Sequence, residues 1–237
     1  MMDTQNLVSD VYKTLSAFNI KNDTEGKGYI ITGTLSFKET YKGYEIEDSF
    51  DITVWWPYNF PQDLPKIFEC GGRIPHDADF HVNVSDNNSL CLATRRSEKE
   101  ILIKNPTFEN YIIKLVIPFL YAFVYKTQKG CYPWGEEKHA DKGLLDDYKA
   151  FFNLPDTQIT EKFLLQLALH KNMKGHHLCP CGSGKKFRNC HAPLYWKLRE
   201  YYTHKNLLID CYSIFSPYLK QNKSLGCLYN EYPNNTQ

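Results

Sequence analysis

Four side chains that can bind a metal lie close together between Cys179 and His191. The segment reads Cys-Pro-Cys-Gly-Ser-Gly-Lys-Lys-Phe-Arg-Asn-Cys-His, so a glycine-rich turn separates one pair of ligands from the other. Zinc prefers four sulfur or nitrogen ligands in a tetrahedron, and two close pairs that face each other supply them with little strain. Metal binding would itself drive the folding of so short a segment. The sequence therefore predicts a structural zinc site formed by Cys179, Cys181, Cys190 and His191.

The same segment resembles the SEC-C motif, a small zinc-binding knuckle, and the match includes its Gly-Ser-Gly-Lys-Lys core. The resemblance favours His191 as the fourth ligand over His176 or His177. It implies a closed site, which has a structural role because no coordination position is left for a substrate. The alternative is a reduced thiol cluster without a metal. Knuckles of this type are usually adaptors for protein partners, and the net charge of +1 makes nucleic acid the less expected partner.

The composition is ordinary for a soluble globular protein, and we expect the protein to be cytoplasmic. Its 237 residues are enough for one domain and a smaller module. The segment from Met1 to Asn6 is polar, without a basic stretch followed by an apolar one, so we expect no signal peptide. The most apolar run, residues 111–124, contains Lys114 and Pro118 and is too short to span a membrane. In the cytoplasm, the eight cysteines are expected to be thiols, metal ligands or a nucleophile rather than disulfides.

The order of periodic segments predicts an α+β fold. A helical pattern over residues 4–19 precedes three strand-like segments, and Lys42-Gly43 is the expected turn between the first two. The expected strands are 29–37, 44–56 and 66–70. Helical patterns dominate the rest of the chain, and the last of them is expected to break near Ser216-Pro217. The expected helices are 106–123, 144–152, 156–171 and 194–219.

A polar, asparagine-rich loop leads directly into Cys91, which lies between two leucines. His81 and Asn83 precede this cysteine by ten and eight positions. A thiolate can attack an activated acyl group and hold it as a thioester, which a second nucleophile then attacks. A side-chain amide N–H nearby can stabilise the tetrahedral oxyanion by about 3 kcal/mol, and Asn83 is the candidate donor. The pattern alone also fits a buried cysteine and an asparagine that only forms a turn.

The spacing resembles that of ubiquitin-conjugating enzymes, where His-Pro-Asn precedes the catalytic Cys-Leu. Trp-Pro-Tyr-Asn-Phe-Pro at 56–61 resembles a second stretch of this family. The resemblance covers residues 1–153 and implies the ubiquitin-conjugating-like fold: an N-terminal helix, an antiparallel meander, an active-site loop and C-terminal helices. It also implies that Cys91 carries a protein C-terminus as a thioester and transfers it to an amine, which forms an isopeptide bond. Asn83 would stabilise the oxyanion, and His81 would hold the loop.

Departures from the common motif point to a prokaryotic branch of this family. Val82 replaces the proline of His-Pro-Asn, and the tryptophan that normally follows the catalytic cysteine is missing. The segment 132–143, with Trp-Gly and His139, and the later Asp147-Tyr148 pair look like the branch found in bacterial antiphage (CBASS-type) operons. By that resemblance, His139 borders the active site and steers the incoming amine. Its alternative role is that of an ordinary surface loop residue.

The resemblance also implies the partners. The cargo would be the C-terminus of a cyclic-oligonucleotide synthase, a CD-NTase-like nucleotidyltransferase, with a ubiquitin-like protein as the alternative, and the acceptor would be another protein. The sequence contains no glycine-rich nucleotide loop, so an activating enzyme must be supplied separately. Three smaller parts follow the catalytic domain: a helical connector at 154–175, the zinc knuckle at 176–192, and a helical segment with a polar tail at 193–237.

Two other classes of protein remain open. One is a catalytically inactive ubiquitin-fold adaptor that recruits partners through its zinc knuckle. The presence of both Asn83 and Cys91 argues against it, because such adaptors commonly lack the cysteine. The other is a papain-like thiol hydrolase, which needs a downstream histidine oriented by an Asn or Asp on a sheet. The helical patterns after Cys91 give that class little support.

Overall fold

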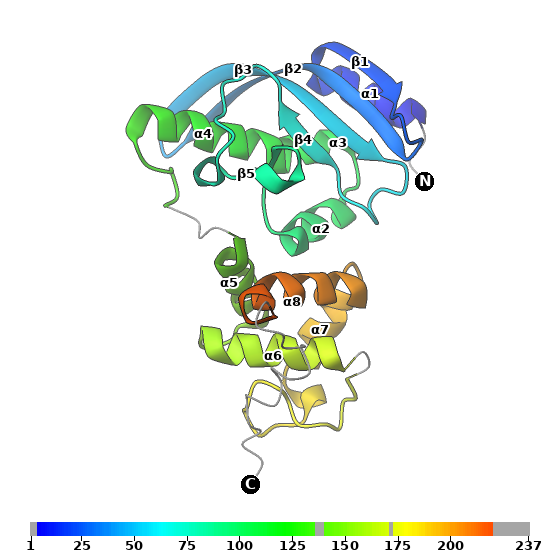
Figure 1. The fold of residues 1–237 in the computed structure, drawn as a ribbon, viewed down its shortest axis with the longest axis vertical. Coiled ribbons are helices and arrows are strands. Elements are labelled where there is room, and N and C mark those ends of the chain that lie inside the picture. Colours follow the sequence, from blue (N-terminus) through cyan, green and yellow to red (C-terminus); the bar gives the residue numbers. More distant parts are fainter. Residues whose placement is uncertain (1–3, 136–139, 171–172, 220–237) are drawn as a thin grey trace. The chain divides into compact units, whose positions relative to one another are not determined.

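The computed structural model describes residues 4–135, 140–170 and 173–219, and the chain forms two compact units (Figure 1). The first unit is Met1–Glu137 and the second is Lys138–Gln237. Each has a core of buried apolar side chains of its own. The first unit combines an antiparallel sheet with helices, and the second contains helices and the Cys/His segment. The predicted mixed α+β class is therefore confirmed.

The first unit begins with a helix, continues through a sheet in which consecutive strands are neighbours, and ends with helices. The sheet has the antiparallel order β1-β2-β3-β4: β1 (Ser16–Asn22), β2 (Gly28–Tyr41), β3 (Tyr44–Pro57) and β4 (Lys66–Glu69). A separate hairpin pairs β5 (Val82–Asn83) with β6 (Ser89–Leu90). The helices are α1 (Thr4–Thr14), α2 (Arg95–Lys104), α3 (Phe108–Tyr111) and α4 (Ile117–Lys129), with short 3₁₀ turns η1 (Ala78–Phe80) and η2 (Val84–Asp86).

The alternation predicted for the second expected strand is confirmed in β3. The four apolar side chains predicted to share one face are all buried: Ile46, Phe50, Ile52 and Val54. The turn between β2 and β3 also lies where the sequence predicts it. Lys42 and Gly43 have φ angles of 48° and 79°, and a two-residue hairpin turn needs such positive values.

The N-terminal helix predicted over residues 4–19 is wrong in its last part. The helix ends at Thr14, and the chain then forms β1, which adds a fourth strand to the predicted three-stranded meander. A Cβ atom at Gly33 of β2 would lie 3.1 Å from the carbonyl oxygen of Ser16 and 3.1 Å from the Cβ of Phe18. Glycine therefore lets β1 cross this point of β2 closely, which helical periodicity does not reveal.

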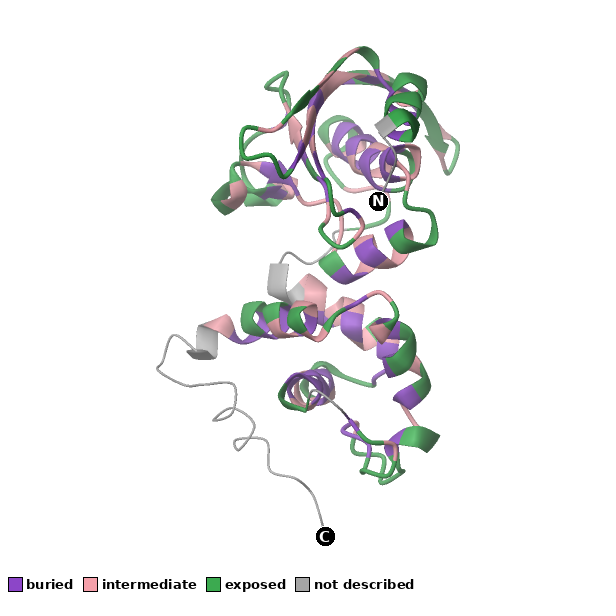
Figure 2. Cartoon of the chain, turned by 90° about the vertical axis from the view of Figure 1, so that its right-hand side faces the viewer, coloured by how far each residue is buried: buried purple, intermediate pink, exposed green. Residues whose placement is uncertain are grey.

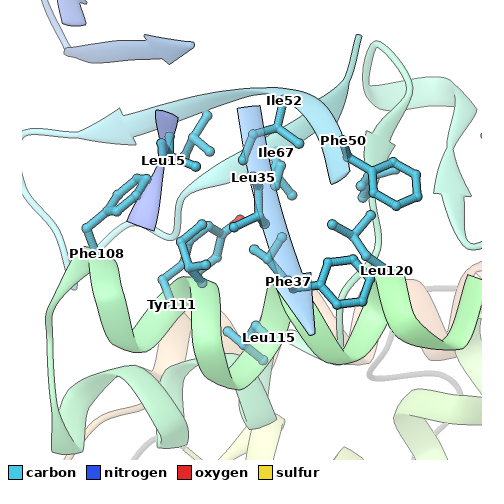
Figure 3. Close-up of a cluster of buried hydrophobic side chains, with 14 of the residues drawn as sticks. Leu15, Leu35, Phe37, Phe50, Ile52, Ile67, Phe108, Tyr111, Leu115 and Leu120 are labelled. Carbon is cyan, nitrogen blue, oxygen red and sulfur yellow. The ribbon is translucent and has the colours of Figure 1, made fainter. Parts of the chain in front are cut away.

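A long helical stretch packs its apolar side against the sheet (Figure 3). It consists of α3, a π-helical turn η3 (Ile112–Val116), and α4. Pro118 has no N–H, and just before it the Ile117 N–H bonds to the carbonyl of Ile112, so the predicted irregularity at the proline is present. The helical side chains in this core include Phe108, Tyr111, Leu115 and Leu120, and their sheet partners include Leu35, Phe37, Phe50, Ile52 and Ile67.

Among the described residues, Phe108–Lys129 is the one helical stretch long and apolar enough to cross a membrane by length and composition. It extends beyond the apolar run at 111–124 because the helix continues to Lys129. More than half of its most apolar window is buried, and it contributes much of the core of the first unit. The stretch therefore serves as a core helix, and the cytoplasmic location stays a prediction.

The second unit is built from helices that bury their apolar sides in its interior (Figure 2). The helices are α5 (Ala140–Phe152), α6 (Thr157–Leu169), α7 (Ala192–Arg199) and α8 (His204–Leu219), with a 3₁₀ turn η4 (Phe187–Asn189). The C-terminal helical segment predicted over residues 194–219 is a pair of helices, α7 and α8. Its break lies between Arg199 and His204 rather than near Ser216-Pro217, where α8 continues.

The boundary between the units lies earlier than the sequence-based division at residue 153. Leu145, Tyr148 and Phe152 of α5 are buried in the core of the second unit. The expected connector at 154–175 is likewise part of that core, since α6 contributes Phe163 and other buried side chains. A helix pattern shows that α5 has an apolar side, but it does not show which core receives that side.

Candidate functional site

The hairpin β5-β6 brings together three of the four residues of the predicted thioester site, His81, Asn83 and Cys91. Val82 pairs with Leu90, and Asn83 pairs with Ser89. The pairing continues one step further, because the Cys91 N–H donates to the carbonyl oxygen of His81 at 2.8 Å. Asn83 and Cys91, eight positions apart in the sequence, therefore lie on one small hairpin.

The asparagines of this loop have a conformational role. Asn87 and Asn88 have φ angles of 53° and 63°, and His81 has a φ angle of 55°. Asn tolerates the left-handed region better than most other residues because its short polar side chain can bond locally. The chain reverses at these positions, and the Asn88 N–H closes the turn by donating to the carbonyl of Asn83 at 3.1 Å.

A chain of hydrogen bonds holds the side chain of Asn83. Its amide nitrogen donates to Ser89 Oγ at 3.2 Å, and Ser89 Oγ donates to Asp86 at 3.1 Å. Lys66 of β4 donates to the other oxygen of Asp86 at 2.6 Å, and this bond lowers the pKa of that carboxyl group. An amide nitrogen carries two hydrogens, so the bond to Ser89 orients the group and uses one of them.

A cleft with a volume of about 230 Å³ lies beside Cys91. Cys91 is partly buried and forms part of its wall. The other lining residues come from the loop before Cys91, the segment after it, the long helix and the segment that follows α4; they include Phe80, His81, Leu92, Ala93, Ile101, Lys114, Leu115, Pro118, Phe119, Ala122, Phe123, Tyr132 and Trp134. Most of these side chains are apolar, so the thiol lies at the edge of an apolar cleft.

Tyr132 fixes one side of this cleft. Its hydroxyl donates to the carbonyl oxygen of Asp79 at 3.1 Å, and Lys126 Nζ donates to the same carbonyl at 2.9 Å. The Lys126 ammonium also lies 4.3 Å from the centre of the Tyr132 ring, which is within the range of a cation–π contact. The ring of His81 packs edge-on against Tyr132, with 5.6 Å between the ring centres. His81 is thus held by its backbone and by its ring, which fits the structural role predicted for it.

A partly buried carboxyl group, that of Glu98, lies at the start of α2, close to the Cys91 segment. Thr94 caps this helix by accepting a bond from the Ser97 N–H at 3.2 Å. The carboxyl group of Glu98 accepts a bond from the backbone of Ala93, which lines the cleft. Burial raises the pKa of Glu98 to about 8, against the bond from Ala93, which lowers it. Burial raises the pKa of Tyr111, and the negative charge of nearby Glu98 raises it further.

In the second unit, the four predicted zinc ligands lie together. The ligand atoms of Cys179, Cys181, Cys190 and His191 are all within 4.8 Å of one another. His191 Nδ1 is 3.2 Å from Cys179 Sγ and 3.2 Å from Cys190 Sγ, and Cys181 Sγ is 3.6 Å from Cys190 Sγ. A tetrahedral site with zinc–sulfur bonds of about 2.3 Å has edges of about 3.8 Å between sulfurs. The cluster therefore matches the size and the ligand types of a zinc site.

The His191 ring is oriented by α5. Its Nε2 lies 2.9 Å from the carbonyl oxygen of Phe152, which can only accept, so Nε2 carries the hydrogen. The lone pair of Nδ1 then faces the thiols, as a metal ligand requires. Burial lowers the pKa of His191, with the Phe152 bond opposing, and so favours the neutral ring that binds metal. Gly182 and Gly184, with φ angles of 79° and 72°, make the turn between the ligand pairs.

Not every predicted site residue can be located. His139 lies outside the described residues. Sequence reasoning missed the support around the site: Lys66, Ser89 and Asp86 around Asn83, Tyr132 beside His81, and partly buried Glu98. These residues come from separate elements, and no spacing rule links them in the sequence.

The match to a known protein family lies within the second unit. Residues 178–193 match the SEC-C motif, and this range contains all four clustered ligands. The motif and the three-cysteine, one-histidine set are compatible with zinc. No curated protein and no solved structure matches the chain.

Proposed function

We propose that the first unit is a ubiquitin-conjugating-like acyl carrier with Cys91 as its nucleophile. The observation that carries the proposal is the hairpin, which places Asn83 and Cys91 on one small element, with Cys91 at the edge of a cleft. The element order supports it too: a helix, an antiparallel meander, the cysteine loop and then helices, as in the fold that the motif implies. The proposal includes a ubiquitin-conjugating-like fold for this unit.

The reaction has two steps. The Cys91 thiolate attacks a protein C-terminus that arrives as a thioester, forms a new thioester and releases the donor thiolate. A neutral amine of the acceptor then attacks the thioester carbon, the amide forms, and Cys91 leaves as a thiolate that takes up the proton lost from nitrogen. Both steps pass through a tetrahedral oxyanion, where Asn83 donates the amide hydrogen that is not directed to Ser89.

We further propose that the zinc knuckle is structural and contacts a protein partner. Its four ligands would complete the coordination of zinc and leave no open position. The cargo is a protein C-terminus, with a cyclic-oligonucleotide synthase of an antiphage system as the first candidate and a ubiquitin-like protein as the second. Where the cargo needs activation, a separate activating enzyme supplies it.

A second candidate function is that of an adaptor without catalysis. The observation in its favour is the exposure of large apolar side chains on the second unit, since Leu178 and Trp196 are 56% and 54% exposed. Exposed aromatic side chains near a knuckle suit partner binding. An adaptor of this kind would not need a reactive Cys91.

The test is an intact-mass measurement of the protein co-expressed with its genomic neighbours. The parent protein should carry an adduct that reducing agents remove, Cys91→Ala should carry none, and Cys91→Ser should carry a stable ester. The adduct mass identifies the cargo. If no adduct forms although one equivalent of zinc is bound, the adaptor function is favoured over the thioester carrier.

The role of Asn83 has a separate readout, the rate at which the loaded thioester passes to an added amine. Asn83→Ala should slow this step by about 100- to 1,000-fold, because the oxyanion loses its donor, and it should slow the loading of Cys91 for the same reason. Ser89→Ala is the matched control, since it removes the partner of Asn83 but keeps the amide. Equal discharge rates in the parent and Asn83→Ala would remove Asn83 from the mechanism.

A further inference from the structure

The cleft beside Cys91 is larger and more apolar than a thioester carrier needs for a glycine tail. Its volume is about 230 Å³, whereas an engineered apolar cavity of about 150 Å³ already binds benzene. Phe119, Ala122 and Phe123 of α4 line it. A single side chain as large as leucine or phenylalanine therefore fits.

The charge of the lining restricts the occupant as well. Lys114 is the only Lys, Arg, Asp or Glu among the lining residues, and it is exposed. Among the described residues, no carboxylate lines the cleft to meet a cationic side chain, and the apolar wall would desolvate any charge that entered. The chemistry thus selects a neutral, apolar occupant.

The position of Cys91 in the wall of the cleft indicates which molecule supplies this occupant. Cys91 is part of the wall, so an acyl group on its sulfur begins at the edge of the cleft. Only the residues next to the acylated carboxyl group of a donor can reach the interior. Resting on the proposed function, we propose that the cleft is a specificity pocket for an apolar side chain in the last two residues of the donor peptide.

This proposal predicts a preference that a chemical donor can measure without an activating enzyme. The probes are short peptide mercaptoethanesulfonate thioesters that end in Gly-Gly, Leu-Gly, Gly-Leu or Asp-Gly. Their acylation rates at Cys91 are read by intact mass, and each is divided by the rate with free N-acetylcysteine to remove intrinsic reactivity. One of the two leucine probes should react about 10- to 100-fold faster than Gly-Gly, as apolar pockets discriminate side chains by such factors, and Asp-Gly should be slowest.

Two variants fill the pocket from different walls. Ala122→Leu changes the buried helix wall, and Ala93→Leu changes the partly exposed wall next to Cys91. Each should reduce the ratio of leucine to glycine rates to about one. Ile103→Ala is the matched control, because Ile103 is an exposed apolar residue of α2 that does not line the cleft. It should keep the preference. If Ala122→Leu does not fold, Ala93→Leu decides.

The outcomes separate this inference from the proposed function. If all probes acylate Cys91 at equal normalised rates, the carrier stands and the pocket inference is overturned. If an octanoyl thioester reacts as fast as the best leucine probe, the pocket serves an acyl chain rather than a peptide side chain, which also overturns it. If iodoacetamide alkylates Cys91 but no thioester acylates it, the proposed function fails and the pocket inference fails with it.

Discussion

At the scale of single residues, Glu98 is the ionisable group whose burial has the clearest consequence for stability. Glu98 is partly buried at the start of α2, and the desolvation of its carboxyl group raises its pKa from 4.5 to about 8. A group whose pKa is higher in the folded protein holds its proton there after the unfolded chain has lost it. The stability that Glu98 contributes is therefore present below pH 4.5 and is lost as the pH rises toward 8.

Glu98→Gln should abolish this loss. Gln keeps the shape and an acceptor for the Ala93 backbone but carries no charge. We expect the variant to be more stable than the parent at pH 8, by at most about 5 kcal/mol, and similar to it at pH 4.5. Thermal unfolding followed from pH 4.5 to 8.5 measures this difference.

Glu100 of the same helix is the matched control with the opposite sign. Burial would raise its pKa, but hydrogen bonds from Arg96 and Lys104 outweigh this effect and lower it. Its contribution is present above its unfolded pKa and is lost as the pH falls. Glu100→Gln should therefore destabilise the protein at pH 7 and lose this effect in acid. Parallel pH profiles for Glu98→Gln and the parent would contradict the assignment to Glu98.

At this scale, the sequence predicted chemistry where several residues form a motif and missed isolated supporting residues. The spacing of Asn83 and Cys91, and that of the four zinc ligands, is local in the chain. A glutamate in the first turns of a helix is normally solvated, so nothing in the sequence marks Glu98 as partly buried. Its burial depends on packing that brings Tyr111, from another helix, close to it.

At the scale of elements, a buried polar cluster joins α5 to α8. Asp210 of α8 is buried and accepts hydrogen bonds from the hydroxyls of Tyr148 in α5 and Tyr202 just before α8. A buried carboxylate is costly unless hydrogen bonds satisfy it, and bonds to charged groups contribute more than neutral ones. The cluster therefore fixes how the two helices pack.

Tyr148→Phe should destabilise the second unit by about 1.5–3 kcal/mol, because Asp210 loses one of its donors while the ring still fills its site. Tyr212→Phe is the control, since Tyr212 lies on α8 and is 56% exposed. Urea unfolding of both variants gives the comparison. Equal destabilisation by the two changes would show that the Asp210 contact contributes nothing specific.

Elements with a strong local signal were predicted well. β2 and β3 alternate and meet at a turn that Lys42 and Gly43 permit, so their pairing could be derived from the chain. The end of α1 could not be derived in this way. It depends on Gly33 of β2, which has no side chain and so lets β1 pass close by. The helix α2 was also missed, since its polar residues give a weak apolar period although Arg96 and Lys99 are buried.

At the scale of the whole molecule, the division at residue 137 makes a direct prediction about fragments. A fragment of residues 138–237 should fold cooperatively and bind one zinc ion. A fragment of residues 154–237 lacks α5, and with it three buried side chains and the carbonyl that orients His191. Each such side chain contributes about 1.5–3 kcal/mol, which together approach the whole stability of a small domain. The shorter fragment should not fold.

Circular dichroism and the zinc content of both fragments measure this outcome, with the full chain as the reference. Chelation of zinc should unfold the longer fragment, because binding and folding are coupled in such knuckles. In the full chain, chelation should leave the first unit folded, since its core is separate. If the two fragments have equal helicity and zinc content, α5 is not needed for folding, and the domain boundary lies near residue 153.

The sequence by itself determined the cluster of three cysteines and His191, the hairpin-forming strands, the mixed α+β class and the choice of Asn83 and Cys91 as a candidate site. These features depend on residues near each other in the chain, where spacing and backbone preference act directly. Tertiary structure alone decided which core α5 joins, that the pKa of Glu98 is raised by desolvation, and that Cys91 borders an apolar cleft. Each of those depends on side chains from distant segments excluding water together, and burial of that kind has no local pattern in the sequence.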